Sequence, residues 1–264
     1  MQRSKMSNNQ KQVSFPNVLY LSGVPLKMIK VKAGRFLMGS PEDEVGRYND
    51  EKLHWVTLTK DYWLGETAVT QGQWEAIIGD NSSWFKKGDD YPVEQVAWYQ
   101  AMDFCDRLNK RFSVKLPVGY MFSLPSEAQW EFACRAGTTT ALNSGKALAS
   151  EMGQCDNLAE VGWYENNSSG TTHPVKHKQP NAMGFYDMHG NVWEWCSDLY
   201  DENYGCYNKD AIDPHGAHRG SFYVNRGGAW SYFAGRCRAA SRSRDLPTYC
   251  SHYLGFRLAL VPVQ

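Results

Sequence analysis

The stretch PVEQVAWYQAMDFCDRLNKRF, residues 92–112, predicts the clearest helix of the fold. Its apolar side chains recur at helical spacing and its charged side chains fall on the opposite side, which is typical of an amphipathic helix packed on a core. The next such stretch, LPSEAQWEFACRAGT at residues 124–138, predicts a second helix that Ser126 caps and Gly137 ends. On the other side of the first, TQGQWEAIIG at residues 70–79 predicts a shorter helix.

Strand-like segments surround these helices. MIKVKAGRFLMGS at residues 28–40 alternates apolar and polar side chains, and residues 55–70 are rich in strand-forming types. A short aromatic strand is expected within residues 184–200, and residues 226–263 begin and end like strands. Residues 138–180 predict long irregular loops. This mixed order of helices and strands favours an α+β fold over a doubly wound sheet.

Composition excludes several classes of protein. The 264 residues carry a formal net charge of zero, which argues against a nucleic-acid partner, because such proteins need a basic face. No apolar run reaches membrane-spanning length, and no signal peptide is recognised, so a cytoplasmic or phage-associated protein is expected. The seven cysteines form no CxxC pair, so reduced and mostly buried thiols are expected rather than a zinc site.

Seven stretches, in order along the chain, resemble motifs of the formylglycine-generating enzyme (sulfatase-modifying factor) family. They are AGRFLMGS, ETAVTQGQWEAI, PVEQVAWYQAMDFCDRLN, LPSEAQWEFACRAGT, NAMGFYDMHGNVWEW, RGGAW and LGFRLAL. The resemblance implies a C-type lectin-like fold of the formylglycine-generating enzyme type, with small twisted antiparallel sheets, two helices and abundant loops. We therefore expect one such domain over residues 28–264, after a disordered or extended segment over residues 1–27.

The resemblance also bears on catalysis. Catalytic members of the family bind copper with a pair of cysteines that closely follow a Gly-Gly-aromatic motif. Here Ser231, Tyr232 and Phe233 stand where the first cysteine is expected, and Cys237 matches the second only loosely. One thiol cannot make a two-thiolate site for Cu(I). We therefore predict that the chain is not an enzyme and binds no copper.

Calcium is the ion that the resemblance makes a candidate, since family members often hold it with loop oxygens. Asn157, Asn191 and Glu194 lie in the matching stretches and offer the hard oxygen ligands that calcium prefers. The alternative is that Asn191 caps a turn and that Glu194 pairs with an arginine.

Within the fold family, the chain is most similar to variable proteins of diversity-generating retroelements. Their hypervariable segment runs from a Gly-Gly-aromatic motif to Gly-Phe-Arg, which corresponds here to residues 229–257. Variation arises by copying template adenines to any base, and AAY codons cannot then encode Lys, Glu, Gln, Met or Trp. Residues 231–255 contain none of these five types, although they make up roughly a fifth of the chain.

The side chains of this segment suit a binding surface. Tyrosine and phenylalanine bury large flat areas at low entropy cost, and serine and threonine adapt their hydrogen bonds. The resemblance therefore predicts a display protein whose C-terminal face binds an unknown protein or cell-surface ligand. The candidate ligand-binding residues, expected on one exposed patch, are Trp230, Ser231, Tyr232, Phe233, Ser241, Ser243, Arg244, Asp245, Leu246, Thr248, Tyr249, His252 and Tyr253.

Three alternatives stay open. The chain could be a formylglycine-generating-type copper oxidase acting on a peptide cysteine, or a non-catalytic structural or signalling domain of the same family. The C-terminal segment could also be an ordinary arginine-rich loop packed on the core, in which case most of the candidate residues would be buried.

Overall fold

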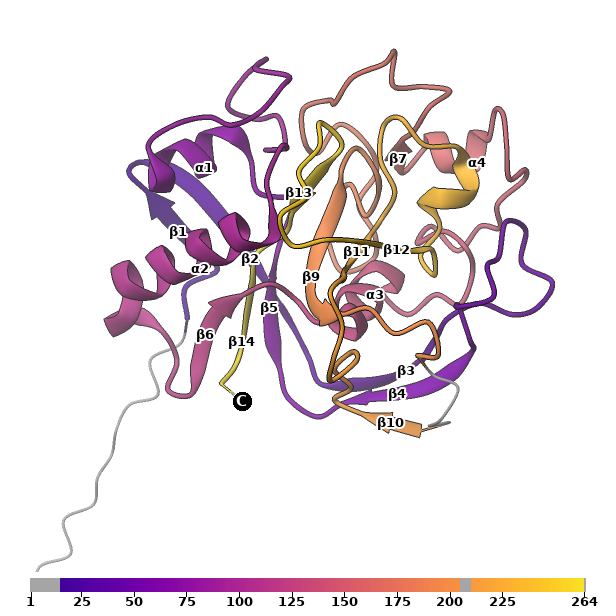
Figure 1. The fold of residues 1–264 in the computed structure, drawn as a ribbon, viewed down its shortest axis with the longest axis horizontal. Helices are drawn as coiled ribbons and strands as arrows, with labels where there is room; N and C mark the ends of the chain where they lie inside the picture. Colours follow the sequence, from indigo (N-terminus) through magenta and orange to yellow (C-terminus); the bar gives the residue numbers. More distant parts are fainter. Residues whose placement is uncertain (1–14, 205–209, 264) are drawn as a thin grey trace, which may run out of the picture.

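The computed structural model describes residues 15–204 and 210–263 (Figure 1). One five-stranded antiparallel sheet has the order β1-β2-β5-β14-β6. Its strands are β1 (Val18–Leu21), β2 (Val24–Val31), β5 (Tyr62–Gly65), β14 (Ala259–Pro262) and β6 (Tyr120–Ser123). The last strand of the chain therefore lies inside this sheet, between two much earlier strands, and closes the domain.

The domain begins earlier than predicted. The expected boundary at residue 28 falls inside β2, which pairs with β1 in a hairpin. Phe15 is buried and packs its ring edge-on against Trp63 and Phe122. The alternation of residues 18–27 is short and is interrupted by a Ser-Gly turn, so the sequence pattern there is weak. Residues 1–14 of the predicted N-terminal segment lie outside the described residues.

The three predicted helices are confirmed as α1 (Gln71–Ile78), α2 (Trp98–Phe112) and α3 (Glu127–Arg135). A single turn, α4 (Asp156–Ala159), and two 3₁₀ turns, Ser113–Lys115 and Ala234–Cys237, add to them. Thr70 and Ser126 cap α1 and α3 through capping boxes. Helix α3 ends at Arg135, and both its C-cap Ala136 and the predicted Gly137 have positive φ, which stops the helix.

The other sheets are smaller. A three-stranded sheet has the order β10-β4-β3, a four-stranded sheet β12-β11-β9-β13, and a two-stranded sheet joins β7 and β8. Their strands are β3 (Gly34–Met38), β4 (His54–Leu58), β7 (Gly162–Trp163), β8 (His189–Gly190), β9 (Trp193–Leu199), β10 (Asp210–Ile212), β11 (Tyr223–Arg226), β12 (Arg242–Asp245) and β13 (Leu254–Phe256).

The sequence predicted antiparallel sheets, but these smaller sheets contain parallel pairs as well. The pairs β10–β4, β13–β9 and β7–β8 are parallel. In the four-stranded sheet, β12 and β13 run the same way at opposite edges, since β11 is antiparallel to both β12 and β9. Residues 246–253 must therefore cross from one end of the sheet to the other, and this crossing forms part of the C-terminal face.

Buried ion pairs join the C-terminal segment, which we define as residues 226–257, to α3. Arg226, on β11, donates to Glu127 at 2.9 Å and also pairs with Glu131. Arg242, on β12, donates to both oxygens of Glu127 at 2.6 and 2.8 Å. The nearby arginines lower the pKa of the Glu127 carboxyl against the opposing effect of its burial. Glu127 is therefore ionised at neutral pH and is shared by two buried guanidinium groups, and Glu131 supplies a second carboxylate to Arg226.

Two further buried pairs fix the remainder of the segment. Arg238 donates to both oxygens of Glu51, at 2.8 and 2.6 Å, and to Glu44 at 2.7 Å. Arg257, next to β13, pairs with Glu194 of β9 at 2.8 Å. Each end and the middle of the segment are thus tied to the scaffold by a guanidinium group with no contact with solvent.

Replacing Glu127 by alanine should destabilise the protein strongly, because Arg226 and Arg242 would remain buried without their shared carboxylate. We expect the free energy of unfolding in a denaturant titration to fall by about 3–5 kcal/mol. The matched control is Asp103→Ala, which removes an exposed helical pair with Arg107 and should cost less than about 0.5 kcal/mol. Equal losses in the two variants would contradict this role of the network.

Candidate ligand-binding site

The C-terminal segment starts and ends at glycines that tolerate no side chain. Gly228 has φ of 76°, and a Cβ there would lie 2.5 Å from the Cys237 sulfur. At Gly255, a Cβ would lie 2.2 Å from the carbonyl oxygen of Val93. These contacts explain why the Gly-Gly-aromatic and Gly-Phe-Arg motifs bracket the segment: the backbone passes too close to its neighbours there for any other residue.

Twelve of the thirteen predicted ligand-binding residues retain solvent contact. Four are exposed: Arg244, Leu246, Thr248 and Tyr249. Eight are half-buried: Trp230, Ser231, Tyr232, Phe233, Ser243, Asp245, His252 and Tyr253. Ser241 is fully buried, so the expectation that it lies on the exposed patch is wrong. Its backbone N–H donates to the carbonyl of Arg238 at 3.1 Å, which closes a turn and points the side chain inward before β12 begins.

Five ring-bearing members of this set form one connected group together with Phe85, and we call this group the aromatic cluster: Phe85, Trp230, Tyr232, Tyr249, His252 and Tyr253. Ring centroids lie 5.3 Å apart for Tyr232 and Tyr253 and 5.4 Å apart for Trp230 and His252. The hydroxyl groups of Tyr249 and Tyr253 share a hydrogen bond of 2.6 Å. Residues from both ends of the segment therefore meet at one place.

Hydrogen bonds to buried backbone hold the cluster in position. The Trp230 indole N–H donates to the carbonyl of His252 at 3.0 Å, and the Trp230 backbone N–H donates to that of Asn191. The backbone N–H of Trp193 donates to the carbonyl of Tyr253 at 2.8 Å. The Tyr232 ring packs edge-on against Trp193 beneath it. The cluster is thus preorganised, which lowers the ordering cost of binding.

The sequence analysis missed the contribution of a second loop. The Phe85 ring packs against Trp230, with centroids 5.4 Å apart, and the neighbouring Trp84 is 71% exposed. The signal was present as two adjacent aromatic residues in the polar stretch DNSSWFKK, residues 80–87. The loop is held firmly, because the Phe85 N–H donates to a Glu94 carboxylate oxygen at 2.7 Å and its carbonyl accepts from Gln71 at 2.8 Å.

A second group of predicted residues lies on β12, at the edge of the four-stranded sheet. Asp245 accepts a hydrogen bond from Asn225 at 3.0 Å, and Arg244 lies over the Tyr200 ring at 4.3 Å. Ser243 and Arg244 line an open groove of about 840 Å³. The predicted patch is therefore divided between the aromatic cluster and this groove, with Trp193 beneath their junction.

Comparison with known proteins places this geometry in a family. The family described as sulfatase-modifying factor enzyme 1-like domain matches residues 23–261, nearly the whole chain. The chain belongs to this family. Formylglycine-generating enzyme of Mus musculus is 29% identical over 78% of this chain and 53% of that protein. Chaperone protein LppX of Paenibacillus barcinonensis is 32% identical over 56% of this chain and 65% of that protein. The chain thus spans about half to two thirds of the length of these relatives.

Solved structures share the fold over almost their whole length. Treponema denticola variable protein 1 has a TM-score of 0.80 and 30% identity, covering 93% of this chain and 98% of that chain. PvdO from Pseudomonas aeruginosa has a TM-score of 0.78 and 26% identity, covering 95% and 99%. Both parts of the predicted resemblance, to the formylglycine-generating enzyme family and to a variable protein, are confirmed, as is the α+β fold of this type.

The side chains of the three residues predicted to hold calcium form hydrogen bonds within the protein. Glu194 accepts hydrogen bonds from Arg257 on both oxygens and from the Trp130 indole at 2.6 Å. Asn191 exchanges two hydrogen bonds of 3.0 Å with the backbone of His173 and so joins two segments that are 18 residues apart in the chain. The alternative stated for Glu194, pairing with an arginine, is what the structure shows. Asn157 donates to the carbonyl of Ala147. Calcium binding at these three residues stays a prediction.

Cys237, which loosely matches the second cysteine of the family's copper-binding pair, lies within a hydrophobic cluster. Cys237 is fully buried, and burial raises the pKa of its thiol to about 12, so it stays protonated at neutral pH. Its Sγ faces the carbonyl of Ala229. Among residues 15–204 and 210–263, no three His, Cys, Asp or Glu side chains group as a metal site. Cys206 lies outside these residues.

Within the described residues, no helix combines the length and apolar character needed to span a bilayer.

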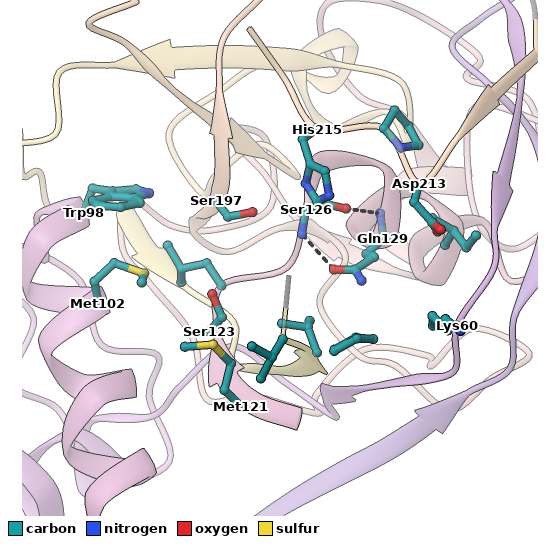
Figure 2. A pocket seen from close by; sticks show the side chains of 16 residues that line it. Lys60, Trp98, Met102, Met121, Ser123, Ser126, Gln129, Ser197, Asp213 and His215 are labelled. Carbon is teal, nitrogen blue, oxygen red and sulfur yellow. Dashed lines mark hydrogen bonds between the residues drawn. The ribbon is translucent and has the colours of Figure 1, made fainter. Parts of the chain in front are cut away.

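A separate cavity of about 490 Å³ opens between α2, β6, α3 and β14 (Figure 2). Trp98, Met102 and Met121 form much of its apolar wall, and Ser123 and Ser197 add hydroxyl groups. None of the thirteen predicted ligand-binding residues lines it. Its hydroxyl and amide groups are largely engaged in local hydrogen bonds, as for Ser126 and Gln129 in the capping box of α3. We therefore place the candidate site at the C-terminal face.

The buried Glu94 beneath the Phe85 loop should make stability depend on pH. Burial raises the pKa of Glu94 to about 7, whereas an unfolded glutamate titrates near 4.3, so the folded state binds more protons between these values. Stability should therefore fall as pH rises through this window. We expect Glu94→Gln to gain about 2 kcal/mol relative to the unsubstituted protein between pH 5 and pH 8.

Denaturant titrations at the two pH values measure this difference. The exposed Glu75→Gln serves as the control and should show no such pH dependence relative to the unsubstituted protein. A pH-independent difference between Glu94→Gln and the unsubstituted protein would contradict the prediction.

Proposed function

We propose that this chain is a ligand-binding display protein whose C-terminal face is diversified by a diversity-generating retroelement. The observation that carries the proposal is the separation of roles within one short segment. A run of solvent-contacting residues, 243–250, which includes Leu246, Thr248 and Tyr249, lies between stretches of buried residues that include the anchors Arg238 and Phe256.

This separation matters because it uncouples binding from folding. Exchanging an exposed side chain away from ion pairs and cores usually changes stability by no more than about 0.5 kcal/mol. The anchors carry the energy that holds the segment, through the pairs with Glu51, Glu127 and Glu194. A face built in this way tolerates many side chains without losing its shape. The high structural similarity to a protein named a variable protein supports the same reading.

The ligand is expected to be a protein or another cell-surface molecule. The aromatic cluster offers rigid rings with polar tips, the side-chain types that dominate antibody loops and binding hot spots. Phe85 of the cluster and the adjacent Trp84 lie outside the predicted variable segment. Part of the contact surface would therefore stay constant while the remainder changes.

Sequencing this locus from several isolates tests the proposal. We expect substitutions to concentrate at solvent-contacting positions such as Leu246, Thr248 and Tyr249, because these make few contacts that folding needs. We expect none at Arg238 or Gly255. A near-identical template repeat differing at adenines, beside a reverse transcriptase gene, should accompany the locus. Substitutions spread evenly over buried and exposed positions, or identical sequences in all isolates beside no such repeat, would contradict the proposal.

The second candidate function is a copper oxidase acting on a peptide cysteine, and it is favoured by relatives named formylglycine-generating enzyme. We expect copper(I) addition to produce no oxygen consumption with a cysteine-bearing peptide, because the Cys237 thiol is buried and protonated. The measurement is oxygen uptake by the unsubstituted protein and by Cys237→Ser. Copper-dependent uptake that Cys237→Ser abolishes would establish the oxidase instead.

A further inference from the structure

We propose that the groove beside β12 is a constant subsite for the carboxylate groups of an acidic peptide segment in the ligand. We call it the arginine groove and define it by Tyr48, Lys52, Tyr200, Arg236, Arg242 and Arg244. The inference rests on the proposed display function and names the chemistry that its ligand would share.

The arginines of the groove differ in how their charge is balanced. Arg242 is buried at its base and is neutralised by Glu127. Arg236 and Arg244 form no ion pair with any carboxylate within residues 15–204 and 210–263. Arg236 donates one hydrogen bond, to the carbonyl of Arg242 at 3.2 Å. Two guanidinium groups therefore line the same groove with most of their N–H donors available to a ligand.

Aromatic rings hold both guanidinium groups in place. Arg236 lies between Tyr48 and Trp193, at 4.9 and 5.3 Å from their ring centroids. Arg244 lies over Tyr200 at 4.3 Å. Ring contacts of this kind occupy the face of a guanidinium group and leave its edge, which carries the donors, free for the bidentate hydrogen bonds that carboxylates accept. The side chains are thus positioned before a ligand arrives.

The surrounding charges favour an anionic ligand. Lys52 adds a third cation that no carboxylate in the groove pairs with directly, whereas Asp50 and Glu202 are the acidic residues that line it. Asp50 is partly neutralised, since it accepts a hydrogen bond from Tyr200 and lies 3.8 Å from Arg242. The volume of about 840 Å³ and the tyrosine walls suit a peptide with acidic side chains better than a free inorganic anion, which would contact one end only.

The arginine groove adjoins the aromatic cluster. Tyr232 of the cluster and Arg236 of the groove both pack against the ring of Trp193, so a single ligand can contact both regions. Arg236 and Lys52 lie outside the predicted variable positions, whereas Ser243 and Arg244 belong to them. A preference for acidic segments would therefore persist as the variable side chains change, and position 244 would tune its strength.

Isothermal titration with hexaglutamate, and with hexaglutamine as the uncharged probe, tests this inference on the full chain. We expect hexaglutamate to bind and hexaglutamine not to bind. Arg244→Gln should weaken hexaglutamate binding about tenfold, because hydrogen bonds to charged groups are worth roughly 1.5–3 kcal/mol. Arg236→Gln should weaken it similarly, and Arg236→Lys should retain part of it. The exposed Arg107→Gln on α2 is the matched control and should leave binding unchanged.

Several results would overturn the inference: equal binding of the two peptides, no binding of either, an equal loss in Arg107→Gln, or tighter binding of inorganic phosphate than of hexaglutamate. Arg244 is exposed, so its variant folds even if substitutions at Arg236 do not. Variation of the locus among isolates is measured independently of peptide binding, so failure of this inference and failure of the display function are distinguishable.

Discussion

The buried pairing of arginines with glutamates is the constraint on which the C-terminal half of the structure depends. Glu127 forms ion pairs with Arg226 and Arg242, and Glu194 forms one with Arg257. A buried guanidinium group without its carboxylate is costly, so each pair permits one arrangement of the backbone that carries it. Between β11 and β14, regular backbone hydrogen bonding comes from the short strands β12 and β13 and one 3₁₀ turn. The buried ion pairs add to these elements in holding the backbone of the segment in place.

This arrangement explains how a small domain can present a broad face without a long ordered strand. The crossing of residues 246–253 is short of backbone pairing, yet its two ends are held by β12 and β13 and by glycines in close contact with their neighbours. The buried residues beneath the face hold its backbone in place. Few of the side chains on the face are therefore needed for folding. Such a division is what a binding surface open to exchange requires, since affinity then depends on the displayed residues and not on the cost of ordering them.

Sequence reasoning succeeded where a pattern is local. The helices follow from apolar periodicity and from the caps at Thr70 and Ser126. The close backbone contacts that bracket the C-terminal segment follow from the motifs that contain Gly228 and Gly255. It failed where exposure depends on partners far away in the chain. Ser241 and Ser243 are two residues apart and chemically identical, yet Ser241 lies in a turn closed on Arg238 and is fully buried, whereas Ser243 on β12 keeps solvent contact. Phe85 could not be assigned to the cluster, since its neighbour Trp230 is 145 positions later in the numbering.

The sequence by itself determined the helices, the glycine motifs that bracket the C-terminal segment, the family, and the amino-acid types in that segment. These features depend on local spacing and on the order of motifs. The tertiary structure alone decided that Glu194 pairs with Arg257, that Ser241 is buried, and that Arg236 and Arg244 line one groove without a carboxylate partner among residues 15–204 and 210–263. The physical reason is that charge pairing and burial are properties of surroundings. A carboxylate or guanidinium group acquires its role only when folding brings distant segments against it.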